Sequence, residues 1–276
     1  MGADRLRGRV AVVTGASSGI GAAAAREMAR RGMHVVLAGR AREALEREAE
    51  AVVSLGGRAL AVPTDVCDRA PVQRLLDASL EHFGRIDVWV NNAGSGLVAS
   101  FEQTTAQEME AIWRVNYMGA FHGCAAALQQ MRRQGRGHIV NVSSLAGRFA
   151  LPLNAAYCAS KAAMTALSHS LRAELEGSGI HVTVVLPGWT ETPFSQNATR
   201  KIPDVCTERR AVRPDPPERV ARAIVAVLRR PRPEVVCLPA PRLVLAVTDL
   251  APSAWHAVAR AYLRVRTGGR GLPPRG

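Results

Sequence analysis

Lysine is almost absent from the sequence, and aromatic residues are few. Of 36 basic residues only Lys161 and Lys201 are lysines, so the other 34 are arginines. Aromatic residues make up 4% of the 276 residues, and the arginines are spread from Arg5 to Arg275 instead of forming a stripe with aromatics between them. Proteins that bind nucleic acids usually show such a stripe. The net charge of +13 therefore does not indicate a nucleic-acid partner.

Cysteine pairs and long apolar runs are also missing. The five cysteines stand far apart without a CxxC pair, so neither a zinc site nor a disulfide framework is expected, and a reducing compartment fits best. The first continuous apolar run ends at Thr14 after four residues, which is too short for the apolar region of a secretory signal. The longest candidate for a membrane span, 235–251, is broken by prolines and charges, whereas a span needs about 18 apolar residues. We expect a cytoplasmic protein, soluble or at most peripheral to a membrane.

Seven short β-branched runs alternate with longer Ala-, Leu- and Arg-rich segments of helical period. The runs lack polar alternation, which is typical of strands buried on both faces; they cover residues 10–14, 34–37, 59–62, 86–90, 138–142, 181–186 and 234–238. The helical segments lie near 20–31, 42–55, 68–83, 105–132, 155–177 and 217–230. This alternation predicts right-handed βαβ units. The predicted fold class is α/β, a doubly wound (Rossmann) parallel seven-stranded sheet with helices on both faces, whose ligands bind beyond the carboxyl ends of the strands.

The same alternation predicts one catalytic domain over residues 1–240. Within it, residues 189–217 are rich in proline and show no period, which is typical of a lid or substrate loop. Residues 241–265 carry apolar residues at mixed spacing and are expected to form a helical appendage. Residues 266–276 are expected to be a disordered tail.

A glycine-rich turn follows directly on the first predicted strand. Residues 14–21 read TGASSGIG, with Gly15, Gly19 and Gly21 just before the helical pattern. Glycines let the backbone turn sharply and approach a ligand closely, and a helix N-terminus offers free N–H groups to phosphate. A tight turn without a ligand is the plain alternative. The strand before it and the helix after it favour a dinucleotide pyrophosphate site.

The second predicted strand ends without the acidic residue that usually binds the adenosine ribose hydroxyls. Its sequence VVLAGR puts Gly39 in that position, with Arg40 next. Loss of the carboxylate removes repulsion against a 2′-phosphate, and a guanidinium can bind that phosphate with paired hydrogen bonds. The sequence therefore predicts NADP(H) in preference to NAD(H).

Polar or small residues also stand at the ends of the next three strands. Asp65 is placed to meet an adenine amino group, the NNAG segment at 91–94 would let a cofactor pass, and Ser143 and Ser144 follow the fifth strand. Turn chemistry explains each of them alone equally well. Because the carboxyl ends of parallel strands share one edge of a sheet, together they favour a site there.

The YCASK segment at 157–161 places Tyr157 and Lys161 on one face of a helix. A tyrosine with a pKa of about 10 is a poor acid or base near neutrality unless a cation stabilises its phenolate. Lys161 is that cation, and we expect it to lower the pKa of Tyr157 into the range useful for proton transfer. A serine hydroxyl, Ser144, could then hold the substrate oxygen. Taken singly, Tyr157 is more often a packing residue and Lys161 a solvated one.

In order and spacing these motifs resemble those of the short-chain dehydrogenase/reductase family. The resemblance covers roughly residues 8–240 and includes the glycine motif, Asp65, NNAG, Asn116, Ser144, the Tyr157 and Lys161 pair and Pro187-Gly188. It implies an NADP(H)-dependent oxidoreductase that interconverts a carbonyl and a secondary alcohol on a small-molecule substrate, without a metal.

The resemblance also implies a role for each site residue. Tyr157 would be the general acid/base, Ser144 would orient the carbonyl, and Lys161 would lower the tyrosine pKa and bind the nicotinamide ribose. Asn116 would hold a water that links Lys161 to solvent. The cofactor would contact Gly15, Ser17, Ser18, Gly19, Ile20, Gly21, Arg40, Asp65, Val66, Asn92, Ala93, Gly94, Tyr157, Lys161, Pro187, Gly188 and either Thr190 or Thr192.

Finally, the resemblance implies a homodimer or homotetramer built by the helices at 105–132 and 155–177. The lid and the appendage depart from the family outline, so the substrate and the oligomeric state stay open. The appendage could block a tetramer interface or rest on a membrane. The competing function is a catalytically silent NADP(H)-binding regulator on the same fold, against which the intact Ser144, Tyr157 and Lys161 argue.

Overall fold

A seven-stranded parallel sheet forms the centre of the molecule. The computed structural model describes residues 5–202, 213–238 and, between 255 and 264, residues 255, 257, 259–261, 263 and 264. The strands lie in the order β3-β2-β1-β4-β6-β7-β9, with bounds β3 Ala59–Pro63, β2 His34–Gly39, β1 Val10–Thr14, β4 Val88–Asn91, β6 Gly137–Val142, β7 Ile180–Pro187 and β9 Glu234–Cys237. Every pair in this sheet is parallel. The predicted fold class is confirmed.

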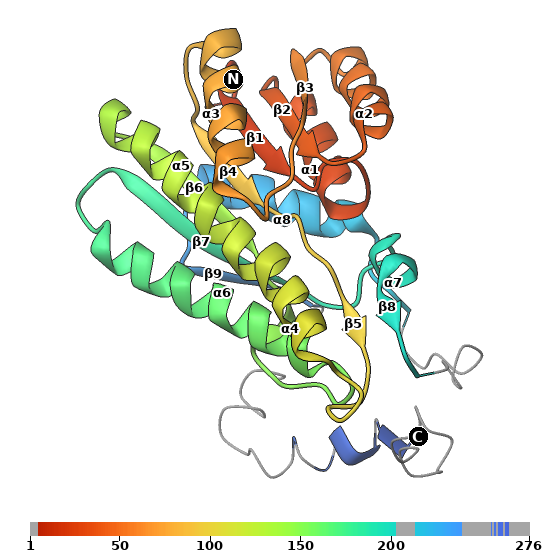
Figure 1. Cartoon of the computed structure of the whole chain (residues 1–276). Helices are drawn as coiled ribbons and strands as arrows, with labels where there is room; N and C mark the ends of the chain where they lie inside the picture. Colours follow the sequence, from red (N-terminus) through yellow and green to blue (C-terminus); the bar gives the residue numbers. More distant parts are fainter. Residues whose placement is uncertain are drawn as a thin grey trace.

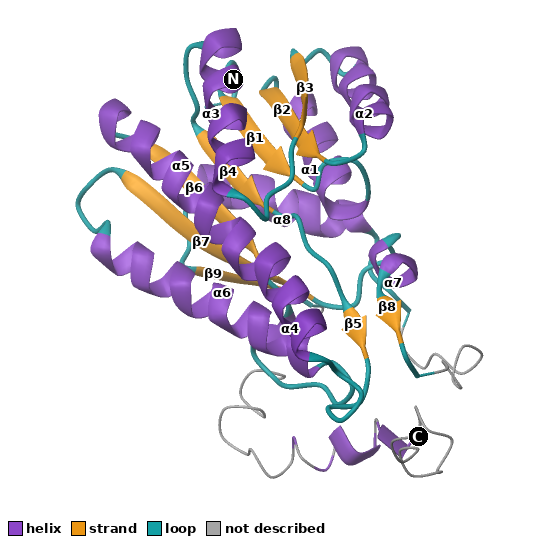
Figure 2. Ribbon diagram, viewed as in Figure 1, coloured by secondary structure: helices purple, strands orange, loops and turns teal. Residues whose placement is uncertain are grey.

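Helices cover both faces of the sheet (Figures 1 and 2). One face packs against α1 (Gly19–Arg30), α2 (Arg42–Ser54) and α8 (Pro217–Arg229). The other packs against α3 (Arg69–Phe83), α5 (Gly119–Gln134) and α6 (Ala155–Glu174). Successive side chains of a strand point to opposite faces, so in β2 Val35 joins the first core and Val36 the second. Because both faces are buried, the strands read as continuous apolar runs.

The long helix predicted at 105–132 is interrupted. It consists of α4 (Ala106–Trp113), a π-helical turn η1 (Arg114–Met118) and α5. A π-turn inserts one extra residue into an α-helix and is found mostly at functional sites. Asn116 lies in the middle of this turn.

The lid region contains regular structure that the sequence does not signal. After β7, residues 194–197 form α7 (Phe194–Asn197) and residues 199–200 form β8 (Thr199–Arg200). β8 pairs in parallel with β5 (Leu97–Val98), a short strand that follows β4. Both lie beyond the carboxyl ends of the main strands (Figure 1). Residues 203–212 of the predicted lid lie outside the described residues.

The described part of the predicted appendage packs beside the loop that precedes α6. Residues 255, 257, 259–261, 263 and 264 are helical. The Trp255 ring lies 4.9 Å from that of Phe149, and its indole N–H donates to the Ala150 carbonyl at 3.2 Å. Residues 241–254, 256, 258, 262 and 265 and the predicted tail 266–276 lie outside the described residues, so the predicted domain boundaries stay predictions. No helix in the described part of the chain is long and apolar enough to cross a membrane.

Candidate active site

The glycine-rich turn joins β1 to α1 in a conformation that suits glycine. Gly15 and Gly19 have positive φ angles of 63° and 54°, which other residues rarely adopt. A Cβ atom on Gly15 would lie 2.8 Å from the Cα of Ala93, and one on Gly21 would collide with the Gly15 carbonyl oxygen. The Ser18 side chain makes no capping bond to the start of α1, so the first N–H groups of this helix are available to an anion. This turn fits the pyrophosphate of a dinucleotide.

Thr14 and Asn92 lock this turn to the NNAG segment. The Thr14 hydroxyl oxygen accepts from the backbone N–H groups of Asn92 and Ala93 at 3.0 and 3.1 Å. The Asn92 side-chain amide in turn donates to the carbonyls of Thr14 and Gly15 at 3.0 and 3.1 Å. The two loops that end β1 and β4 therefore form one rigid edge of the site.

The residues predicted to meet the adenosine lie together at the ends of β1, β2 and β3. A Cβ atom on Gly39 would lie 3.7 Å from the Ser17 hydroxyl oxygen, so these two residues are neighbours. Arg40 is exposed. A hydrogen bond from the Cys67 backbone N–H lowers the pKa of Asp65, and the positive charge of Arg40 lowers it further. Gly39 and Ser17 are thus uncharged neighbours here, and the exposed Arg40 adds a positive charge at the end of β2.

Asn116 links the π-turn to the loop after β4 and to α6. It is fully buried, and its Oδ1 accepts from the Ser95 N–H at 2.8 Å. Its Nδ2 donates to the Ser95 carbonyl at 2.9 Å and to the Ser160 hydroxyl at 3.0 Å. A Cβ atom on Gly94 would lie 3.2 Å from Asn116 Oδ1 and 3.6 Å from Lys161 Nζ. The fold thus brings Asn116 and Lys161 together on the side of Gly94 where a Cβ atom would stand.

Lys161 is buried at 3% exposure. Its Nζ donates to the Val142 carbonyl at 2.9 Å and lies 6.0 Å from the centroid of the Tyr157 ring. Burial disfavours the charged form of a lysine and lowers the pKa of Lys161 to about 8. The Lys161 side chain therefore carries its positive charge at neutral pH, but it loses its proton at a pH only slightly higher.

The pKa of Tyr157 moves in the direction opposite to our prediction. Burial raises it to about 12, and a side-chain hydrogen bond with Ser144 opposes the rise. The prediction that Lys161 lowers this pKa into the useful range is wrong for the ligand-free protein, because burial of the phenol is the largest cause and raises the pKa. The ammonium lies beside the ring and hydrogen-bonds to the Val142 carbonyl. Ser144 nevertheless lies where the motif requires it, within hydrogen-bonding reach of the phenol.

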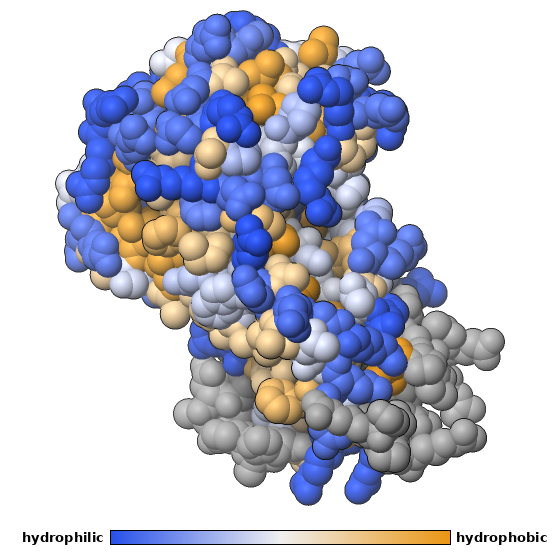
Figure 3. Space-filling view, viewed as in Figure 1, coloured by the Kyte–Doolittle hydropathy of each residue, from blue (hydrophilic) through white to orange (hydrophobic). Residues whose placement is uncertain are grey.

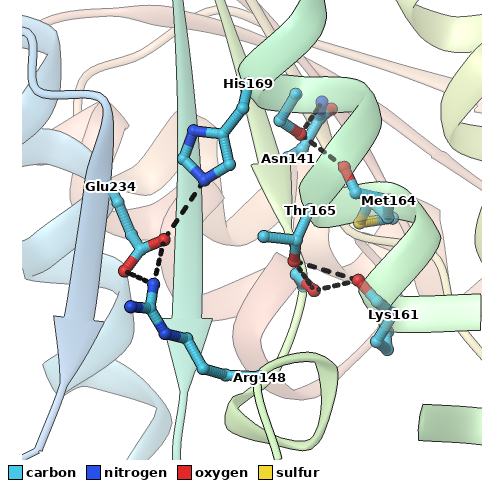
Figure 4. Close-up of polar contacts among 9 residues, drawn as sticks. Asn141, Arg148, Lys161, Met164, Thr165, His169 and Glu234 are labelled. Carbon is cyan, nitrogen blue, oxygen red and sulfur yellow. Dashed lines mark hydrogen bonds and ion pairs between the residues drawn. The ribbon is translucent and has the colours of Figure 1, made fainter. Parts of the chain in front are cut away.

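Two hydroxyl groups fix the backbone of α6 at Lys161 (Figure 4). Ser143 and Thr165 both donate to the Lys161 carbonyl, at 2.8 and 3.0 Å. The loop after Ser144 is tied to the last strand, because Arg148 donates to Glu234 at 2.9 Å and His169 Nε2 lies 3.3 Å from the same carboxylate (Figure 4). Of the two adjacent serines, Ser143 is thus structural and Ser144 faces Tyr157.

The segment after β7 returns to the glycine-rich turn. Thr190 is buried, and its hydroxyl donates to the Gly188 carbonyl at 3.1 Å. A Cβ atom on Gly19 would lie 3.0 Å from the Thr192 side chain. Thr192 therefore faces the cofactor turn, whereas the Thr190 hydroxyl is already engaged with the backbone of Pro187-Gly188.

Sequence reasoning missed two residues at this site. Thr14 holds the two cofactor loops together. The sequence feature that could have identified it is a polar residue at the end of an apolar strand. Phe194 has a ring centroid 5.6 Å from that of Tyr157, and the irregular lid sequence gives no sign of it. The remaining predicted residues gather along the carboxyl edge of the sheet.

Comparison with known proteins explains this arrangement. The family model described as short chain dehydrogenase matches residues 9–203. The chain belongs to the short-chain dehydrogenase/reductase family. The ketoacyl reductase HetN of Nostoc sp. is 31% identical to this dehydrogenase over 93% of this chain and 90% of that protein.

Two solved structures resemble this short-chain dehydrogenase. A short chain dehydrogenase/reductase from Burkholderia phymatum, in complex with NAD, has a TM-score of 0.79 and 27% identity and covers 100% of both chains. An alcohol dehydrogenase from the archaeon Thermococcus sibiricus, complexed with 5-hydroxy-NADP, has a TM-score of 0.73 and 28% identity and covers 83% of this chain and 95% of its own. This dehydrogenase is accordingly an oxidoreductase for alcohol or ketone groups that uses a nicotinamide dinucleotide.

Proposed function

We propose that the protein is an NADP(H)-dependent carbonyl reductase that interconverts a carbonyl and a secondary alcohol. The observation that carries this proposal is the position of Ser144 within hydrogen-bonding reach of the Tyr157 phenol, beside the buried ammonium of Lys161. Reduction is the physiological direction we propose, because cellular NADP(H) pools usually favour it. The substrate we propose is a mid-sized, fairly apolar carbonyl compound.

Tyr157 moves the proton in this mechanism. Its hydroxyl donates the proton to the carbonyl oxygen, while Ser144 hydrogen-bonds to the same oxygen and orients it. The Lys161 ammonium stabilises the phenolate that remains. The nicotinamide cofactor, when bound, supplies the hydride.

Asn116 supports the return of the proton from solvent. Its amide is held rigidly by Ser95 and Ser160, and the neighbouring Gly94 leaves a gap towards Lys161 Nζ that a side chain would fill. We assign to Asn116 the positioning of a water on the path between Lys161 and solvent.

The cofactor residues are proposed to act in three groups. The turn with Gly15, Ser17, Ser18, Gly19, Ile20 and Gly21 holds the pyrophosphate. Arg40, Asp65 and Val66 bind the adenosine end, with Arg40 on the 2′-phosphate of NADP(H). Asn92, Ala93, Gly94, Tyr157, Lys161, Pro187, Gly188 and Thr192 surround the nicotinamide ribose and carboxamide, and Thr192 is preferred to Thr190 because it faces Gly19.

Replacement of Tyr157 tests the proposed function. NADPH consumption is followed with a panel of ketones, quinones, steroids and β-ketoacyl thioesters. Tyr157→Phe is expected to lower kcat about 100- to 10,000-fold on every compound that the wild type reduces, because it removes the proton donor. Tyr117→Phe, on the π-turn, is the matched control and is expected to keep activity. Turnover of Tyr157→Phe at the wild-type rate would remove the proposed acid. NADPH binding without turnover of any carbonyl by the wild type would favour the catalytically silent regulator.

We also propose that the protein is a homo-oligomer. Trp113 on α4 and Phe121 on α5 are exposed at 37% and 44%, and Tyr117 lies between them with its ring 4.5 Å from that of Trp113. Figure 3 shows pale and orange side chains over the face that carries α5 and α6, surrounded by blue. Exposed aromatic side chains of this kind are enriched at protein interfaces.

A further inference from the structure

Phe194 opens α7 and projects from the lid toward the catalytic residues. Its ring centroid lies 5.6 Å from that of Tyr157, and the two rings are tilted by 52°. The residue is half-buried. Since Tyr157 acts on the carbonyl in the proposed function, this phenylalanine lies beside the place where the substrate reacts.

The Phe194 ring packs against two glycines of the loop after β4. A Cβ atom on Gly96 would lie 3.2 Å from Phe194 Cε1 and Cζ, which is tighter than ordinary contact. A Cβ atom on Gly94 would lie 3.7 Å from Phe194 Cε2 and 3.6 Å from Lys161 Nζ. The ring therefore lies flush on the backbone of this loop, next to the buried ammonium.

The lid that carries Phe194 is anchored directly after α7. β8 pairs with β5, so that Leu97 is opposite Thr199 and Val98 opposite Arg200. Lys201 Nζ donates to the Glu108 carboxylate and to the Gln103 carbonyl, both at 2.7 Å. Phe194 is thus presented from an anchored segment, which is what a fixed substrate contact requires.

We propose that Phe194 is a specificity-determining residue whose ring forms the apolar wall of the substrate site beside Tyr157 and favours carbonyl groups carried on a flat ring. This inference rests on the proposed carbonyl reduction. Aromatic side chains gain stabilisation from offset or tilted packing with another ring, whereas an open chain gains no such contact and loses rotational freedom when it is ordered. Aryl ketones and quinones are therefore the expected substrate class.

Phe194→Leu removes the flat aromatic face but keeps an apolar side chain, so it tests what the ring itself contributes to substrate preference. The readout is the ratio of kcat/KM for an aryl ketone to that for an open-chain aliphatic ketone with the same number of carbons. We expect the wild type to favour the aryl ketone and Phe194→Leu to lower the ratio about 3- to 10-fold, from the loss of one aromatic pair. Both ketones are assayed at saturating NADPH, so that a change in cofactor affinity does not enter the ratio. Phe101→Leu is the matched control, since Phe101 is 77% exposed on the β5–α4 connection, and it should keep the ratio.

Gly96→Ala provides a second, independent test because the added methyl group would push the Phe194 ring away from the backbone of this loop. It is expected to lower the same ratio, and the double variant Gly96→Ala/Phe194→Leu should lower it no further than Phe194→Leu alone. The inference is overturned if Phe194→Leu keeps the ratio, including the case in which both ketones are slowed equally. Failure of the proposed function looks different, because the wild type would then reduce neither ketone.

Discussion

Lys161 is a cation that the fold keeps away from water. Its folded pKa of about 8 lies below the value of about 10.4 for an unfolded lysine. The folded state therefore binds this proton more weakly than the unfolded state. The charged lysine therefore destabilises the folded state by its full amount below pH 8. This destabilisation fades as the pH rises towards the pKa of the unfolded lysine.

Replacement of Lys161 should consequently separate stability from activity. We expect Lys161→Met to raise the free energy of unfolding at pH 7, and this gain to shrink between pH 8 and pH 10. The same variant should reduce carbonyls about 100-fold more slowly, because no cation stabilises the phenolate. Denaturant unfolding at pH 7 and pH 10 measures the first effect. Lys201→Met, at a more exposed lysine, should show no such gain at pH 7. A less stable Lys161→Met at pH 7 would show that the ammonium is stabilised by its bond to Val142.

Arg40 sets the cofactor preference in the proposed function. Because a charged hydrogen bond to phosphate contributes about 1.5–3 kcal/mol, Arg40→Ala is expected to weaken NADPH binding about 10- to 100-fold and NADH binding by less than about threefold. Dissociation constants for both cofactors, measured by fluorescence titration, test this. Arg222→Ala, at an exposed arginine of α8, is the control. Equal losses for the two cofactors would exclude a 2′-phosphate contact.

At the scale of elements, an ion pair at the end of β8 helps to hold the lid in position. Lys201 joins β8 to the start of α4 through Glu108, which also caps that helix with Thr105. Half-exposed ion pairs contribute about 1 kcal/mol or less, so Lys201→Met should leave global stability nearly unchanged. It should raise the KM for the carbonyl about two- to fivefold, because a loosened lid presents Phe194 less well. Arg42→Met, which breaks the exposed pair with Glu46 on α2, should leave KM unchanged. An unchanged KM in Lys201→Met would show that β8 alone holds the lid.

The elements differ in how far the sequence could predict them. Each strand of the main sheet is a local apolar run, and the glycine turn and the Tyr157 and Lys161 pair have fixed spacing, so all of these could be predicted. The β5–β8 pair joins two-residue segments that are far apart in the chain, and no local pattern marks it. The pKa of Tyr157 could not be predicted either, since spacing gives the neighbour but burial decides the direction.

At the scale of the whole molecule, Trp113, Tyr117 and Phe121 form an aromatic stripe along α4, η1 and α5. We expect this stripe to contact a second copy of the chain. Trp113→Arg together with Phe121→Arg should convert the oligomer to monomers, because charged residues are depleted at interface cores. Light scattering after size-exclusion chromatography measures the mass. Val53→Arg, at a valine of α2 that is 57% exposed, is the control and should keep the wild-type mass. An oligomer that survives the double substitution would assign assembly to another face.

The π-turn connects that outer surface to the interior. Trp113 and Tyr117, in ring contact on the outside, flank Asn116 in sequence, and Asn116 is fully buried on the inside. Deleting one residue from 114–118 would remove the extra residue of the π-turn and restore a regular helix, so the aromatic rings and the buried amide would no longer keep their present relative positions. The proposed assembly surface and the proposed proton path thus share the same few residues, and a length change at this point is expected to alter both together.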